Sequence, residues 1–173
     1  AWVGLFAPAS AVIAALSMIP AAIGTYIYPQ MTHRLGRTGD PSSLWPIAKA
    51  TALWPLAISL PAALCLLPIV PSLVRYLAPA YEASIPATQW VVGAGVFMGA
   101  SVAANALASL KAYRWMAVFV VVRLALLSAL PWAGGKWMGG ITGVAMGMTV
   151  AYSLDFVTVL ALTRAATRPL ARQ

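Results

Sequence analysis

The sequence predicts an all-α, polytopic membrane protein with five transmembrane helices. Hydrophobic residues make up 62% of its 173 residues and charged residues only 8%, whereas about a quarter of a typical soluble domain is charged. Five apolar stretches are each long enough to cross a bilayer, which takes about 20 residues as a helix. They are apolar on every face, and this argues against a β-barrel, whose strands alternate over about ten residues.

The five predicted spans account for most of the chain and are separated by short polar or basic segments. They cover about residues 6–30, 44–73, 87–109, 115–132 and 137–162. Pro20 should kink the first span, because a proline removes one helical hydrogen bond. Four more prolines interrupt the second span: Pro55, Pro61, Pro68 and Pro71. We therefore expect the second span to bend or unwind near its far end.

Four connecting segments are expected between the spans. The first, residues 32–43, is polar, and its Asp40-Pro41-Ser42-Ser43 sequence can cap the following helix. The second, residues 75–86, should hold a short interfacial helix. Residues 110–113 should form a tight turn, and residues 133–136, with two adjacent glycines, should form a flexible loop.

Basic residues indicate how the spans are oriented. The net charge is +8, and the loops on the two sides of the membrane contain very different numbers of basic residues. Eight basic residues fall on one side: Arg34, Arg37, Lys49, Lys111, Arg114, Arg164, Arg168 and Arg172. The other side has Arg75 and Lys136, and Arg123 lies within a span. The positive-inside rule then places Ala1 outside and Gln173 in the cytoplasm, so topology explains the charge better than a nucleic-acid partner does.

The titratable residues form no enzymatic or metal-binding pattern. The single cysteine, Cys65, excludes an intrachain disulfide, and the single histidine, His33, has no cysteine or carboxylate cluster nearby. Asp40, Glu82 and Asp155 are scattered over two loops and a span, so paired carboxylates are not expected. The sequence has neither a phosphate-binding glycine loop nor a loop long enough for a catalytic domain. We expect no catalytic residue, metal or cofactor, and a role in transport.

The start of the sequence suggests an upstream part. The first apolar stretch follows Ala1 almost at once, without the basic region, short apolar core and cleavage site of a signal peptide. We expect a fragment of a longer membrane protein, with a processed chain as the alternative. An odd number of spans with an external start also suits a missing upstream segment.

Arg123 and Asp155 are the most informative pair in the sequence. Arg123 follows Arg114 by nine residues, and Asp155 precedes Arg164 by nine residues. Nine residues rise about 13.5 Å in a helix, so the two should lie at similar depth on adjacent antiparallel helices. An unpaired charge there costs several kcal/mol, which each residue would relieve for the other. The pair is either an anion-binding or ion-coupling site beside a cavity, or a structural lock between two helices.

Other polar residues within the spans are candidates for lining a cavity. Asn105 lies near the end of the third span, and Tyr26 and Gln30 lie in the last turns of the first. Interhelical hydrogen bonds, each worth about 0.6 kcal/mol, are the simpler role for such groups.

Small residues recur every four positions in two spans. They are Gly95, Gly99 and Ala103 in the third span, and Gly139, Gly143, Gly147 and Ala151 in the fifth. Such ridges let helices approach closely, so we expect them to pack rather than to bind ligand. Asp155 continues the second ridge by one more step of four and should face a neighbouring helix or the bundle interior.

Four short motifs resemble those of polysaccharide flippases. They are Gly4-Leu5-Phe6 leading to Ala9, Pro29-Gln30-Met31-Thr32 before a basic loop, Leu77-Ala78-Pro79-Ala80-Tyr81-Glu82-Ala83, and Gly140-Ile141-Thr142-Gly143-Val144-Ala145. Each motif is loose by itself, but their order and spacing extend over nearly the whole chain. Pro79 departs from the family pattern, which has a glycine near that position.

This resemblance implies membership of the multidrug/oligosaccharidyl-lipid/polysaccharide exporter superfamily, whose members have two six-helix lobes around a central cavity. The five helices would form most of one lobe, as helices eight to twelve of twelve, with the N-terminal half of the same protein missing. The implied activity is alternating-access flipping of undecaprenyl-pyrophosphate-linked oligosaccharide repeat units across the bacterial inner membrane, for surface polysaccharide biosynthesis. The implied partners are this lipid-linked oligosaccharide and the membrane lipids.

The resemblance also suggests roles for individual residues. We expect Arg123, Asn105, Tyr26 and Gln30 to bind substrate, and Asp155 to couple transport to a proton or sodium gradient. Three alternatives stay open at this point: a multidrug or other small-molecule antiporter of the same superfamily, an integral membrane glycan polymerase or ligase, and a bundle that only scaffolds partners. The polymerase would need larger external loops than this sequence provides.

Overall fold

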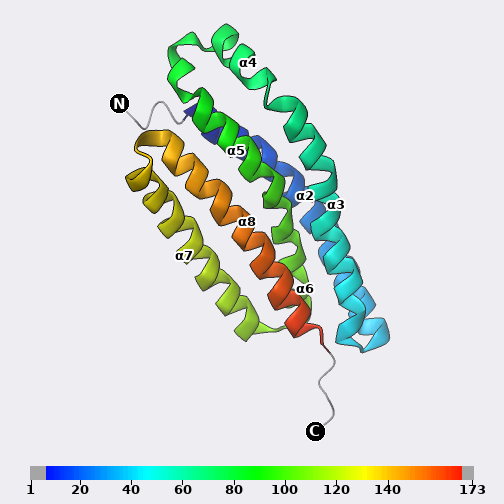
Figure 1. The fold of residues 1–173 in the computed structure, drawn as a ribbon. Coiled ribbons are helices and arrows are strands. Elements are labelled where there is room, and N and C mark those ends of the chain that lie inside the picture. Colours follow the sequence, from blue (N-terminus) through cyan, green and yellow to red (C-terminus); the bar gives the residue numbers. More distant parts are fainter. Residues whose placement is uncertain (1–6, 169–173) are drawn as a thin grey trace.

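The computed structural model describes residues 7–168, which form an all-helical bundle with no strand in that range (Figure 1). Five helical stretches are long and apolar enough to cross a membrane: Ser10–Thr38, Pro41–Leu66, Pro79–Ser109, Tyr113–Trp137 and Gly140–Ala166. The predicted all-α class with five apolar helices is therefore confirmed. Residues 1–6 and 169–173, which include Gly4-Leu5-Phe6 and Arg172, lie outside the described residues.

The five stretches consist of α-helices (α) and short 3-10 helices (η). In chain order they are α2 (Ala7–Thr38), η1 (Pro41–Leu44), α3 (Trp45–Leu66), α4 (Ile69–Leu77), η2 (Pro79–Ser84), α5 (Ile85–Met98), η3 (Gly99–Ala104), α6 (Asn105–Ser109), α7 (Tyr113–Trp137) and α8 (Gly140–Ala166).

The first helix is longer than the span predicted at residues 6–30. α2 continues to Thr38 through most of the segment expected to be a loop, so that expectation is wrong for residues 32–38. Charged side chains end the apolar stretch there without ending the helix, because most residues of its last turns are exposed. Gly39, with φ of 64°, ends it, and its N–H donates to the Leu35 carbonyl at 2.8 Å.

The second span breaks where its prolines predicted, and it is shorter than residues 44–73. α3 ends at Leu66, and the separate helix α4 begins at Ile69. Val70 and Val74 on α4 are buried, whereas Leu73 is 47% exposed. An amphipathic α4, followed by η2, therefore replaces the far end of the predicted span and most of the predicted loop at residues 75–86.

The third span starts two residues earlier than predicted and contains an unpredicted 3-10 segment. α5 and α6 are joined by η3, so one continuous helical rod covers residues 85–109 with a tighter middle, and η2 precedes it from Pro79. This segment lies in close contact with α3, because a Cβ on Gly99 would lie 2.6 Å from Cβ of Pro55. Glycine at position 99 leaves room for the proline ring beside the rod.

The expected loop at residues 133–136 is wrong, and it changes the bounds of the last two spans. α7 runs unbroken from Tyr113 to Trp137, and the turn follows at Gly139 and Gly140, both with positive φ. Gly134 is instead a helical contact residue, because a Cβ there would clash with the Gly143 carbonyl of α8. The fifth span is accordingly Gly140–Ala166 rather than 137–162.

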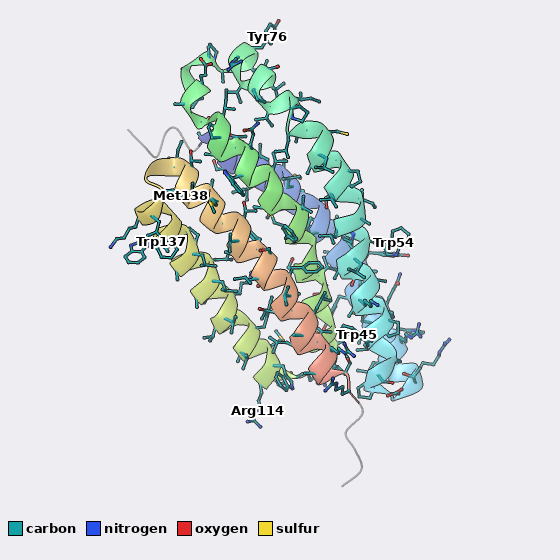
Figure 2. All side chains as sticks on the ribbon, viewed as in Figure 1. Trp45, Trp54, Tyr76, Arg114, Trp137 and Met138 are labelled. Carbon is teal, nitrogen blue, oxygen red and sulfur yellow. The ribbon has the colours of Figure 1, made fainter. Side chains whose placement is uncertain are left out.

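The rod formed by α5, η3 and α6 is the most buried of the five stretches. α2, α3 and α8 all pack against it, and α7 packs mainly on α8 at the edge of the bundle (Figure 1). Large apolar side chains point outward elsewhere: Trp54 is 68% exposed and Trp137 is 88% exposed (Figure 2). Such a surface suits lipid rather than water.

Charged residues gather at the two ends of the bundle. The end where α2 stops, α3 starts and α8 stops carries seven described basic residues, namely Arg34, Arg37, Lys49, Lys111, Arg114, Arg164 and Arg168. The opposite end carries Arg75 and Lys136 (Figure 2 labels Arg114 at the first end and Trp137 at the second). The uneven distribution expected from the sequence is therefore present in the fold.

Replacing Gly147 with alanine should destabilise the contact between α7 and α8. A Cβ at Gly147 would clash with the backbone carbonyl of Leu130, which cannot move away as a flexible side chain could. We expect Gly147→Ala to lower the free energy of unfolding by about 1–3 kcal/mol, measured by thermal unfolding in detergent. The matched control is Gly36→Ala, since nothing lies within 4 Å of a Cβ there. Equal stability of the two variants would contradict the close packing.

Asp40 should stabilise the junction between α2 and η1 in a pH-dependent way. The Ser42 hydroxyl and then its backbone N–H, at 2.9 Å from Oδ1, donate to the Asp40 carboxylate and hold its pKa below the ordinary 3.8. A lowered pKa means that this stabilisation is present above pH 3.8 and is lost as the pH falls through the folded-state pKa. We expect Asp40→Asn to speed hydrogen exchange of the Ser42 amide at neutral pH, with the difference from wild type disappearing in acid.

Candidate functional site

The predicted meeting of Arg123 and Asp155 is present in the structure. Arg123 lies ten residues into α7, and Asp155 lies eleven residues before the end of α8, so each is about 15 Å from the basic end of its helix. Arg123 Nε is 3.8 Å from Asp155 Oδ2. That separation makes an ion pair without a tight hydrogen bond, which leaves guanidinium N–H groups for another acceptor.

Asp155 is held in the interior by the glycine ridge of α8. Gly143, Gly147, Ala151 and Asp155 recur every four residues and are all buried, as the sequence predicted for Asp155. Its side chain is only 4% exposed. Within residues 7–168, Oδ1 is buried and has no hydrogen-bond partner. A buried carboxylate oxygen without a partner is costly, so an additional proton or cation would stabilise it.

Arg123 is the more accessible partner and lines a small cavity. Its side chain is 33% exposed, and its Cζ lies 5.7 Å from the centroid of the Phe119 ring. The cavity has a volume of about 280 Å³ and lies between α2, η3, α6 and α7. Its other polar residues are Ser17, Ser101 and Asn105, and apolar residues complete the wall.

Most polar groups of this cavity are already hydrogen-bonded. Asn105 Nδ2 donates to the Gly24 carbonyl of α2 at 3.3 Å, so the interhelical hydrogen bond expected for such a residue exists alongside cavity lining. The Ser17 and Ser101 hydroxyls each donate to the carbonyl three residues earlier, at 2.7 Å and 3.0 Å. The guanidinium of Arg123 is therefore the principal donor that the cavity offers to a ligand.

Tyr26 and Gln30 are not brought to this cavity. Both lie on exposed positions of α2, with Tyr26 69% exposed, and neither lines the cavity at Arg123. The reason is helical phase, because the face of α2 that meets Arg123 carries Ser17, Ala21 and Gly24 at the i, i+4, i+7 positions of one stripe. Tyr26 and Gln30 remain expectations for a surface that this part of the chain leaves open.

Sequence reasoning missed Ser17 and Ser101 as cavity residues. Ser101 precedes Asn105 by four residues, so a common face could have been inferred from their spacing. Ser17 is a polar residue in an apolar span, three residues before the kinking Pro20. That the faces carrying Ser17 and Ser101 both meet Arg123 depends on how three helices pack together. The sequence of any one helix does not show it.

No group of three or more metal-ligating side chains comes together in the part of the chain that the structure describes. The acidic residues are far apart in the fold, with Asp40 at η1, Glu82 at η2 and Asp155 within α8. What the site can do chemically is bind an anion at Arg123 and exchange a proton or a monovalent cation at Asp155.

Removing the positive partner should destabilise the protein more than removing both charges. Arg123→Gln leaves the Asp155 carboxylate buried and unpaired, and we expect a loss of about 3 kcal/mol in the free energy of unfolding. The double variant Arg123→Gln/Asp155→Asn should recover part of that loss. The control is Arg75→Gln, whose ion pair with Glu82 at 2.8 Å is exposed and should contribute less than about 1 kcal/mol. A double variant less stable than Arg123→Gln would argue against the ion pair.

Comparison of the chain with protein-family models, with curated proteins and with solved structures found no match. The proposal for function therefore rests on the chemistry of Arg123, Asp155 and the adjacent cavity.

Proposed function

We propose that this chain forms part of a flippase that moves undecaprenyl-pyrophosphate-linked oligosaccharide repeat units across the bacterial inner membrane by alternating access. The observation that carries the proposal is the partly exposed guanidinium of Arg123 in mid-helix, at the wall of a cavity and 3.8 Å from a buried carboxylate. A charge at membrane depth is costly, and proteins retain it mainly where it serves a site.

Arg123 is suited to the pyrophosphate of such a substrate. A guanidinium stays charged and presents several N–H donors in a plane, so it can hold phosphate oxygens through two parallel hydrogen bonds. Phe119 packs against one side of it, and Asn105 and Ser101 place an amide and a hydroxyl in the same cavity. The Asn105 amide would donate hydrogen bonds to the first sugar and accept them from it, and the Ser101 oxygen would accept one.

Asp155 is suited to coupling. When it is charged it attracts Arg123, and its unpartnered Oδ1 is the place for a proton or a sodium ion. Binding of either would neutralise the carboxylate and weaken its attraction to Arg123, and the guanidinium would then be available to the pyrophosphate. The gradient of that ion would thus be linked to substrate binding through one pair of side chains.

The rest of the proposed assembly follows from topology. The end of the bundle rich in basic residues would face the cytoplasm, with the start of α2 at the external side. The missing N-terminal half of the same protein would cover the open side of the cavity, and Tyr26 and Gln30, exposed on α2, would contribute from the shared surface. Neither an enzymatic step nor a nucleic-acid partner belongs to this mechanism.

The proposal predicts that both charged residues are needed for translocation. In a flipping assay with the full-length protein, Arg123→Ala and Asp155→Asn should each lower the rate by roughly tenfold to a hundredfold, as expected when hydrogen bonds to a charged group are lost. Arg123→Lys should recover only part of the rate, because it keeps the charge but loses the planar donors.

Arg75→Ala is the control for this assay, since Arg75 is a cation at the exposed end of the bundle, paired with Glu82. It should flip substrate at the wild-type rate. Full activity of both Arg123→Ala and Asp155→Asn would overturn the assigned roles. Export of cationic dyes without any flipping of lipid-linked sugar would instead favour a small-molecule antiporter.

A further inference from the structure

Arg123 lies between a buried carboxylate and an open cavity. Its Nε is 3.8 Å from Asp155 Oδ2, and its side chain also lines the cavity of about 280 Å³. The side chain of Asp155 is only 4% exposed, and Asp155 is not among the residues that line this cavity. An anion in the cavity would therefore contact Arg123 and not Asp155.

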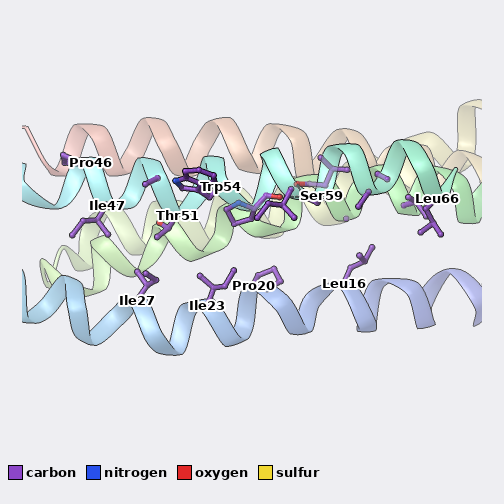
Figure 3. Close-up of a pocket in the computed structure, with 18 residues that line it drawn as sticks. Leu16, Pro20, Ile23, Ile27, Pro46, Ile47, Thr51, Trp54, Ser59 and Leu66 are labelled. Carbon is purple, nitrogen blue, oxygen red and sulfur yellow. Dashed lines mark hydrogen bonds between the residues drawn. The ribbon is translucent and has the colours of Figure 1, made fainter.

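The larger cavity of the bundle offers an anion nothing comparable. This apolar groove has a volume of about 660 Å³ and lies between α2 and α3 (Figure 3). Only Thr51, Trp54 and Ser59 among its described lining residues carry polar side-chain atoms, and none of its lining side chains is charged. An anion there would lose its water without gaining a cation. Of these two cavities, the one at Arg123 is the one that suits an anion.

A bound anion and a charged Asp155 would compete for the same positive charge. A charged Asp155 already neutralises Arg123, so an anion in the cavity would add a second negative charge beside a single cation. Such crowding is costly where the local dielectric is low. A neutral Asp155 would leave the full charge of Arg123 to the anion. Anion binding should therefore be strong only when Asp155 is neutral.

Arg123 is the charged group that faces Asp155 from the elements packed on α8, which are α7, α5, η3, α3 and α6. α5, η3 and α6 carry no charged side chain. Tyr152, one turn before Asp155 on α8, makes no hydrogen bond to its buried Oδ1. The other titratable residues of these helices lie within two turns of a helix end: Lys49, Cys65, Tyr113, Arg114, Lys136 and Arg164. The charge state of Asp155 is thus felt mainly by Arg123.

The surroundings of Asp155 suit a proton better than a sodium ion. Transporters coordinate sodium with carbonyl groups that are freed where a helix unwinds. α7 and α8 are unbroken helices on either side of the pair, so their carbonyls there are used in helical hydrogen bonds. Among the described residues, no hydroxyl lies within hydrogen-bond distance of Oδ1. The guanidinium of Arg123 would also repel a metal cation. A proton needs no such shell of oxygen ligands.

We propose that Asp155 takes up a proton, and not a sodium ion, when an anion binds at Arg123, so that one proton accompanies each bound pyrophosphate group. The proton comes from water and forms an O–H bond at Oδ1, the oxygen without a partner. This inference rests on the proposed function for the identity of the anion, and it adds which ion Asp155 binds and when. Because linkage is reciprocal, a proton on Asp155 raises the affinity for the anion by the same factor as the anion raises the affinity for the proton.

The test measures anion binding to the purified full-length protein by isothermal titration calorimetry. The probe is the symmetric dimethyl diester of pyrophosphate, which carries two permanent negative charges near neutral pH. Wild type should bind it more tightly as the pH falls, by up to about tenfold per pH unit, the limit for one linked proton. Titrations in buffers of different ionisation enthalpy should show about one proton taken up per bound probe.

Two variants separate the roles of the pair. Asp155→Asn should bind the probe at every pH as tightly as wild type does in acid, without proton uptake, because its amide is neutral and similar in shape. Arg123→Gln should weaken binding by roughly tenfold to a hundredfold, as expected for lost hydrogen bonds to a charged group.

Two control variants should keep both the affinity and the pH dependence of wild type. Arg75→Gln removes the arginine of the exposed ion pair with Glu82, at 2.8 Å. His33→Gln removes the only histidine of the 173 residues, and histidine is the residue type that ordinarily changes charge near neutral pH.

Infrared difference spectra report on the carboxyl group directly. Addition of the probe to wild type should produce the C=O band of a protonated carboxyl, and Asp155→Asn should lack that band. Thermal unfolding of each variant shows that it is folded, and the wild-type spectrum keeps the test decisive if a variant is not.

Three results would overturn the inference. The first is wild-type binding of the probe without pH dependence or proton uptake, and the second is proton uptake that persists in Asp155→Asn. The third is tighter binding when sodium replaces potassium, seen in wild type and absent in Asp155→Asn, which would assign the carboxylate to sodium. Each of these leaves the flippase proposal standing. Linked binding of probe and proton without translocation of lipid-linked sugar would instead overturn the proposed function and support the inference.

Discussion

Close backbone contact between α7 and α8 is the constraint on which the candidate site depends. Between helices in lipid there is little hydrophobic driving force, so association relies on van der Waals packing and on small residues that let backbones touch. Gly134, Gly143 and Gly147 provide that contact, and a Cβ on any of them would meet the backbone of the opposite helix. The same contact sets the register that brings Arg123 to within 3.8 Å of Asp155.

A second pair of glycines arranges the rest of the bundle around the central rod. Gly95 and Gly99 receive Leu16 and Pro55, so α2 and α3 each pack mainly on the rod and less on each other. α2 consequently separates two cavities of opposite character, and Pro20 lines both. On one side lies the polar cavity at Arg123, and on the other lies the apolar groove. A cavity with polar residues and an apolar groove are thus only one helix apart.

The distribution of charge explains why these few polar residues matter. Almost all described basic residues lie toward the bundle ends, and Asp155 with Arg123 is the ion pair within the described spans. Asp155 is almost fully buried and Arg123 is not. In the proposed function that asymmetry would separate the roles of the two residues, because a buried carboxylate would respond to a small ion while a partly exposed guanidinium would meet a larger anion.

The sequence by itself determined the helical class, the five apolar stretches, the break after Leu66 and the common depth of Arg123 and Asp155. Each of these follows from local rules: length of apolar runs, loss of a helical hydrogen bond at proline, and rise per residue. Tertiary structure alone decided that Gly134 packs instead of turning, that η3 tightens beside Pro55, and that Tyr26 and Gln30 point away from the cavity. These outcomes depend on which helix lies alongside which, and a single helix carries no information about its neighbour.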